Sequence, residues 1–226
     1  GGPDKALDSF SDIQKAINQF YRDEKNNEGL KCGLKNPDLE KCHQIQHKTF
    51  HKKHLVWLKT KKSDEESQHK GSSSFFNESE IKRIKTTLDF LNKSYEKIEK
   101  KPSVGVITFY GSQLSELTSL EKKGFWRLPR EDRNYPHLDI RFGTVDRFQG
   151  QEKDIIIVSL VRNNKRHEVG FAKKPHRINV AFSRARNLLI IVGNPDNFRF
   201  GNNEKSAQQY DEIFNIAKKF GSVKGE

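Results

Sequence analysis

Apolar positions along the first hundred residues predict two helices with one short strand between them. Residues 9–22 carry apolar side chains at helical spacing: Ile13, Ala16, Ile17, Phe20 and Tyr21. The run HLVWLK at residues 54–59 predicts a strand. Asn77 is placed to cap a longer helix, with Glu80 three residues later in the position of a capping box. The apolar stripe of that helix advances in steps of three and four: Ile81, Ile84, Leu88, Leu91, Tyr95 and Ile98.

Beyond Pro102, predicted strands alternate with predicted helices. Apolar runs predict strands at residues 104–109, 138–145, 154–161 and 188–193. Helical spacing is found at about 112–123, 176–186 and 206–220. The run DIIIVSLV is apolar on both faces and rich in β-branched residues, as a central parallel strand should be. This order predicts an α/β fold in which right-handed crossovers join the strands of a parallel sheet.

Two polar segments interrupt the pattern. Residues 23–54 are basic and rich in histidine, and residues 60–74 read TKKSDEESQHKGSSS. We expect both to be insertions or loops within one domain that takes up all 226 residues. No run approaches 18 apolar residues, so the sequence predicts no membrane-spanning helix, and no basic-then-apolar leader opens it.

The charge balance favours a polyanionic partner. Lys and Arg number 42 against 30 Asp and Glu, a net charge of +12, which is common in proteins that bind nucleic acid. A basic protein without such a partner stays open on charge alone. Two cysteines exclude a disulfide scaffold and favour a reducing compartment, so we expect the cytoplasm. The chain has no methionine and begins Gly-Gly-Pro, which we interpret as a fragment of a longer protein.

Polar residues follow two of the predicted strands. The segment VGVITFYGSQ places Thr108, Tyr110 and Gln113 after a buried strand, where parallel sheets bind ligands. An ordinary strand-to-helix turn would also account for them. The segment TVDRFQGQEKDIIIVSLVRNN surrounds Gly150 with polar residues and ends in Arg162, Asn163 and Asn164. Holding so many polar groups at one junction is costly unless they bind something.

A third segment, HRINVAFSRARNLLIIVG, carries arginines on the predicted helix 176–186. Asn179, Ser183 and Arg186 follow the spacing of one helical face. Arginine suits phosphate because its guanidinium offers permanently charged, paired donors. We therefore expect a phosphate-binding group beside the ligand edge of the sheet, although a solvated basic helix is the simpler alternative.

Together these three segments resemble the second RecA-like domain of superfamily 1 helicases. The resemblance is to the branch that contains the nonsense-mediated decay helicase and its bacterial relatives, and it is strong over about 90 residues. It implies a three-layer α/β/α RecA-like fold and an ATP-dependent helicase or translocase that acts on DNA or RNA. Phe109 stands where the family usually has proline, His176 replaces an arginine and Ser183 replaces a threonine.

The resemblance also implies roles for individual residues. Arg184 matches the arginine finger that reaches the γ-phosphate of ATP, and Gln149, Gly150 and Glu152 match positions near the nucleotide. On the nucleic-acid side, Thr108 and Thr144 match positions that hold the strand's backbone. We assign the remaining polar residues of these segments to the same surface: Tyr110, Gln113, Arg162 and Asn164.

No phosphate loop of the form G-x-x-x-x-G-K-[ST] occurs in the sequence. By resemblance, ATP and Mg²⁺ are then held mainly by an N-terminal RecA-like domain of the same protein, and this chain alone is inactive. The partners implied are that domain and single-stranded nucleic acid. Two alternatives stay open: a nucleic-acid-binding module without catalysis, and an interaction domain in which zinc binds among Cys32, Cys42, His43, His47, His51 and His54.

Overall fold

The computed structural model describes residues 43–120 and 135–225. The predicted helix at 9–22 lies outside these residues. Six parallel strands form one sheet in the order β5-β4-β6-β7-β1-β8, so the predicted α/β class is confirmed. The strands are β1 (Leu55–Leu58), β4 (Ser103–Thr108), β5 (Asp139–Thr144), β6 (Lys153–Ser159), β7 (Ala185–Val192) and β8 (Ser222–Lys224). Strand β8, which no sequence pattern suggested, extends the sheet beside β1.

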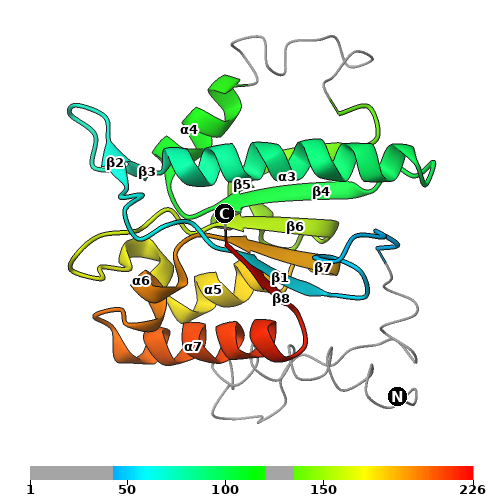
Figure 1. Ribbon diagram of the computed structural model, residues 1–226. Coiled ribbons are helices and arrows are strands. Elements are labelled where there is room, and N and C mark those ends of the chain that lie inside the picture. Colours follow the sequence, from blue (N-terminus) through cyan, green and yellow to red (C-terminus); the bar gives the residue numbers. More distant parts are fainter. Residues whose placement is uncertain (1–42, 121–134, 226) are drawn as a thin grey trace.

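Helices cover both faces of the sheet, as Figure 1 shows. Helices α3 (Glu78–Glu96) and α4 (Gly111–Leu120) lie on one face. The other face carries α5 (Pro175–Phe182), α6 (Pro195–Arg199) and α7 (Glu204–Lys219). A two-stranded ribbon, β2 (Ser67–Gln68) and β3 (Phe75–Phe76), precedes α3. Two 3₁₀ helices, η2 (Val145–Phe148) and η3 (Gly170–Lys173), complete the described elements.

Strand β6 shows how the sequence pattern produces two cores. Ile155 and Ile157 belong to the core under α3 and α4, whereas Ile156 and Val158 belong to the core under α5 and α7. Successive side chains of a strand point to opposite faces, so an unbroken apolar run is buried only between two helical layers. The three-layer arrangement therefore follows from this strand.

Helix α3 confirms the stripe read from the sequence as far as Tyr95, since Ile81, Ile84, Leu88, Leu91 and Tyr95 are all buried. The last predicted position, Ile98, lies in the turn after the helix and is partly exposed. Asn77 caps the helix by accepting a hydrogen bond from the Glu80 amide at 3.1 Å. The capping box is incomplete, however. The Asn77 amide donates to Gln113 Oε1 instead, and the Glu80 carboxylate bonds to the end of β6.

The predicted helix 176–186 is wrong beyond Phe182. Helix α5 ends there, and Ala185 already pairs with Lys153 in the sheet. Asn179, Ser183 and Arg186 therefore do not share a helical face. The ladder to β6 replaces the helical hydrogen bonds, because the apolar run that follows is long enough to form an eight-residue strand.

Parts of the two polar segments pack against the domain. Ile45 and Phe50 are buried beside α3, and the Phe50 ring stacks on Phe90 with centroids 5.1 Å apart. Residues 60–74 contain only the short strand β2. Among the described residues, no helix has the length and apolar character needed to cross a membrane.

Candidate nucleotide and nucleic-acid edges

All six strands run parallel, so their carboxyl ends meet at one edge of the sheet, which we call the carboxyl edge. Thr108 ends β4, Thr144 ends β5 and Ser159 ends β6. The first turn of α3 reaches the same edge, because the Glu80 carboxylate contacts Ser159. The parallel sheet predicted from the sequence already implied that these strand ends share one edge. The sequence assigned Glu80 only to a capping box and not to this site.

Glu80 is fully buried and connects α3 to the end of β6. Its carboxylate accepts hydrogen bonds from Ser159 Oγ at 2.6 Å and from the Val161 amide at 2.9 and 3.0 Å. Gln113 donates to the same serine hydroxyl at 2.8 Å. Burial raises the pKa of Glu80 from 4.5 to about 8, against the opposing effect of these hydrogen bonds. Gln113 belongs to α4 and is completely buried, so its hydrogen bond to Ser159 attaches that helix to the network.

The network fixes a bend in the chain immediately after β6. Val161 has a φ of 71°, in the left-handed region that β-branched residues strongly disfavour. Such a conformation costs on the order of 1–3 kcal/mol and persists only where its surroundings enforce it. Here Glu80 accepts from the Val161 amide, and Asn77 donates to the Val161 carbonyl at 3.2 Å. The bend sets the direction in which residues 162–164 leave the sheet.

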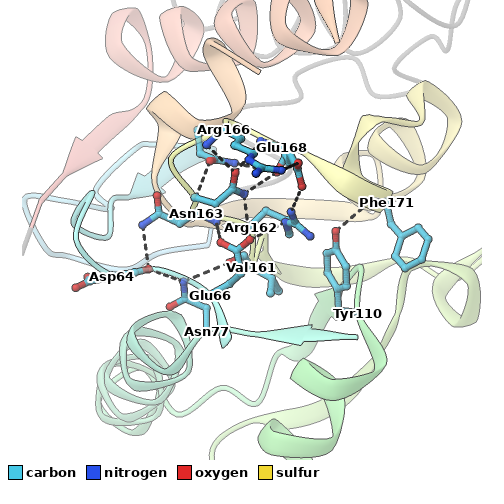
Figure 2. A network of polar contacts seen from close by, with 12 residues as sticks. Asp64, Glu66, Asn77, Tyr110, Val161, Arg162, Asn163, Arg166, Glu168 and Phe171 are labelled. Atoms are coloured by element: carbon cyan, nitrogen blue, oxygen red, sulfur yellow. Dashed lines mark hydrogen bonds and ion pairs between the residues drawn. The ribbon is translucent and has the colours of Figure 1, made fainter. Parts of the chain in front are cut away.

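Arg162 is buried between two carboxylates and an aromatic ring. Its Nε lies 2.9 Å from Glu66 Oε1, which is an ion-pair distance whose direction does not meet hydrogen-bond geometry. Its Nη2 donates to Glu168 at 3.0 Å. The guanidinium carbon lies 3.9 Å from the centroid of the Phe75 ring, within the range of a cation–π contact. Figure 2 shows Arg162 between Glu66 and Glu168 within a network of hydrogen bonds and ion pairs.

Asn163 and Asn164 attach the polar segment 60–74 to the carboxyl edge. The Asn163 side chain donates to the carbonyls of Lys61 and Asp64, each at 2.9 Å. The Asn164 side chain donates to Glu66 and to the Glu168 carbonyl, each at 3.0 Å, and its Oδ1 accepts from the Glu168 backbone amide. Both asparagines therefore use their polar atoms within the protein.

The residues predicted to contact nucleic acid divide by exposure. Thr108, Tyr110, Gln113 and Arg162 are buried, while Thr144 and Asn164 are partly exposed. The buried group shapes the edge from beneath, and their burial was not visible in the sequence. Glu66 and Glu80, which hold Arg162 and Val161 in place, were missed because their partners lie far away in the chain.

The residues predicted to lie near the nucleotide gather at the opposite, amino edge of the sheet. Gln149, Gly150 and Glu152 are exposed in the turn that leads into β6. Arg184 lies beside them, because its carbonyl accepts the Lys153 amide at 3.0 Å. Gly150 has a φ of +76°, and a Cβ there would meet no atom within 4 Å, so the turn is open to a ligand.

This placement corrects one expectation about the arginines. Residues 177–186 were expected beside the same edge as Arg162. Strand β6 separates the two edges, and its seven residues span roughly 20 Å at about 3.3 Å per residue. Arg184 therefore lies far from Arg162, at the other end of the sheet.

Arg184 differs from the arginines around it in its partners. Arg162, Arg177 and Arg186 each pair with a carboxylate, from Glu66, Asp146 and Glu152 respectively. Among the residues that the structure describes, Arg184 pairs with none. Its Nη2 donates to Ser183 Oγ at 2.7 Å, and its Nε is buried without a hydrogen-bond partner. A buried donor left unsatisfied is costly, so this guanidinium suits an anionic ligand.

The zinc hypothesis rests partly on Cys32 and Cys42, which lie outside the described residues. Within the described ranges, no group of three His, Cys, Asp or Glu side chains is placed to hold a metal. His43 Nε2 lies 2.9 Å from the Lys53 carbonyl, and its Nδ1 accepts from the Ile45 amide at 3.1 Å. Burial lowers the pKa of His43 below its usual value, which favours the neutral ring.

Residues 11–196 of the chain match the protein family described as AAA domain. The chain is 39% identical over 145 residues to DNA polymerase alpha-associated DNA helicase A of Saccharomyces cerevisiae, covering 62% of this chain and 19% of that protein. It is 40% identical over 124 residues to the regulator of nonsense transcripts 1 homolog of Drosophila melanogaster, covering 54% and 10%. The chain thus spans about a fifth of these relatives or less.

A comparison with solved structures finds a match to a domain of similar extent. It is the C-terminal domain of a possible DNA helicase from Lactobacillus plantarum WCFS1, with 16% sequence identity and a TM-score of 0.38. The match covers 70% of this chain and 81% of that domain.

Proposed function

The chain belongs to the AAA domain family and is the C-terminal RecA-like domain of a superfamily 1 helicase, and on this premise we propose that it is one half of an ATP-driven motor on single-stranded nucleic acid. The other half is an N-terminal RecA-like domain of the same protein, which holds most of the ATP and Mg²⁺. This chain contributes an arginine finger and part of the strand-binding surface. The relatives named above include a DNA helicase and a regulator of nonsense transcripts, so both DNA and RNA remain candidate substrates.

The separation of the two predicted groups of residues supports this proposal. Gln149, Gly150, Glu152 and Arg184 gather at the amino edge, whereas Thr108 and Thr144 end strands at the carboxyl edge. The rigid strand β6 joins the two edges. A domain built in this way can contact a nucleotide at one edge while it holds a nucleic-acid strand at the other, as a motor requires.

The amino edge fits the phosphates of ATP. The Arg184 guanidinium has no carboxylate partner among the described residues, and its Nε is buried without a hydrogen bond. Bound ATP supplies the transferable phosphoryl group. Arg184 would neutralise the charge that develops on that group, and Gly150 would let the chain approach it closely.

Substitution of Arg184 in the full-length protein tests the proposal. Arg184→Ala should lower ATP turnover by roughly 10³–10⁵-fold, the effect typical of an arginine finger. ATP binding should change far less. Arg184→Lys should restore little, because lysine keeps the charge but loses the paired donors of the guanidinium.

Arg186→Ala is the internal control. Arg186 is exposed on β7 and already pairs with Glu152 at 3.3 Å, so its removal should have a milder effect. Steady-state ATP hydrolysis, measured on variants whose circular dichroism matches the parent, distinguishes the two arginines. Near-normal turnover in Arg184→Ala would reject the finger.

Two other functions have less support. A binding module without catalysis leaves the unpaired guanidinium of Arg184 without a role. A zinc-stabilised interaction domain finds no group of ligands among the described residues. We propose the cytoplasm as the compartment, from the two cysteines of the sequence.

A further inference from the structure

Phe171 is exposed at the carboxyl edge without an evident structural reason. It lies in η3, and half of its surface is open, at 50% exposure. Among the described residues, the other exposed large apolar side chain is Phe200, at 62% exposure. Neither residue was selected from the sequence. A half-open aromatic ring at a ligand edge offers a flat surface on which another ring can stack.

The position of Phe171 is fixed from beneath by Tyr110. The Phe171 amide donates to the Tyr110 hydroxyl at 3.0 Å, and the two ring centroids lie 5.2 Å apart. Gly170 makes this approach possible, since a Cβ there would lie 2.0 Å from the Tyr110 oxygen. Tyr110 lies two residues after the end of β4 and packs edge-on against Phe75. Figure 2 shows the Phe171 ring turned away from the Arg162 network.

Phe171 also lies near the end of β5. The Arg177 guanidinium carbon is 5.7 Å from the Phe171 centroid, and Arg177 pairs with Asp146 in η2, two residues after Thr144. Thr108 ends β4 two residues before Tyr110 in the chain. Through Tyr110 and Arg177, the exposed ring therefore contacts the two segments that follow the threonines predicted to hold the nucleic-acid backbone.

The segment around Phe171 is strongly basic. Residues 165–177 contain Lys165, Arg166, Lys173, Lys174 and Arg177 against a single carboxylate, Glu168. That carboxylate is paired with Arg162 and lies 3.9 Å from Arg166, and Arg177 pairs with Asp146. Lys165, Arg166, Lys173 and Lys174 are exposed. A rigid aromatic ring among exposed cations is the combination that binds single-stranded nucleic acid without reading its sequence.

We propose that Phe171 is a base-stacking residue, on which one unpaired base of a single strand lies while the neighbouring cations hold its phosphates. The proposal rests on the proposed function and adds to it the residue that contacts a base. Tyr110, whose hydroxyl anchors the Phe171 backbone, acts as its positioning residue. Because the ring is held before binding, little conformational entropy is lost on contact.

The test compares two oligonucleotides of equal length and charge, one with pyrimidine bases and one with abasic sites throughout. Binding to the purified chain is followed by fluorescence anisotropy at low ionic strength. The parent should bind the base-bearing strand about 5- to 150-fold more tightly, the range that base–aromatic stacking supports. Phe171→Ala should remove most of that preference, and Phe171→Trp should retain it.

Matched variants separate stacking from charge and from general packing. Phe200→Ala removes a ring that is more exposed, at 62%, beside Arg199, which is paired with Asp196 and Asp211, and should leave the preference unchanged. Lys173→Ala should weaken binding of both strands equally and reduce the salt dependence, by about 0.7 in the log–log slope for each lost phosphate contact. Tyr110→Phe keeps the ring but loses the hydroxyl, so it should reduce the preference partly.

Equal affinity of the parent for the two strands would overturn stacking while leaving the proposed function intact. A preference that survives Phe171→Ala unchanged would also overturn it. If Phe171→Ala weakened binding of both strands to the same degree, Phe171 would support the backbone contacts rather than contact a base, and the proposal would be wrong. Binding of neither strand by the parent would reject the proposed strand-binding surface itself.

Discussion

Glu80→Gln isolates the effect of one buried charge on the stability of the carboxyl edge. The substitution keeps the size of the side chain and removes its ability to ionise. Burial raises the pKa of Glu80 from 4.5 to about 8, while its hydrogen bonds from Ser159 and Val161 favour the ionised form. Desolvation is the larger effect at this site, which is completely buried.

The sign of the pH dependence follows from the direction of this change. Between pH 4.5 and about 8, the folded protein retains a proton on Glu80 that the unfolded chain has released. Its contribution to stability is therefore complete below pH 4.5 and is lost as the pH rises through about 8. At about 1.4 kcal/mol for each pH unit, the loss is on the order of 5 kcal/mol.

Urea unfolding followed by circular dichroism measures this effect in the parent and in Glu80→Gln. At about pH 5 the variant should be equally stable or slightly less stable, since the protonated carboxyl and the amide are both neutral. At about pH 9 the variant should be the more stable protein by several kcal/mol, because it avoids the cost of a buried charge. Other titrating groups, including buried His43, cancel in the difference.

Glu78→Gln is the control on the same helical turn. Its side chain is 72% exposed, so its substitution should produce no difference that depends on pH. A constant difference between the parent and Glu80→Gln across this pH range would refute the reasoning. It would mean that the hydrogen bonds from Ser159 and Val161 keep Glu80 ionised throughout.

Two further predictions concern Arg162 and the isolated chain. Arg162→Ala should lower the free energy of unfolding by about 3–5 kcal/mol, because Glu66 would remain buried without its partner. Arg166→Ala, at an 86% exposed side chain, should change it by less than about 0.5 kcal/mol in the same urea titration, and equal effects would contradict the buried pair. The 226-residue chain should release no phosphate from ATP, since it contains no phosphate loop. Phosphate release that nucleic acid stimulates, and that persists through repurification, would contradict this prediction.

The sequence alone determined the layers of the fold, because the local spacing of apolar residues shows which faces of a strand or helix must be buried. The run at 154–161 required cover on both faces, and the stripe from Ile81 to Tyr95 identified which side of α3 faces the sheet. The three segments that carry the resemblance to helicases could be located for the same reason, since each begins or ends at a recognisable strand. Strand β8 escaped notice because three residues carry too little periodicity to stand out from a loop.

Only the tertiary structure decided which edge each residue occupies and which side chains are free to bind. Helix α5 ends at Phe182 because the backbone beside Arg184 pairs with β6, a partner that helical periodicity does not reveal. Arg162 is buried because Glu66 and Phe75, both distant in sequence, converge on it. Among the described residues, Arg184 has no carboxylate partner, and Glu152, the carboxylate in the same turn, pairs with Arg186 instead. Such pairings arise from contacts between distant segments, so a residue's type and its neighbours in sequence cannot specify them.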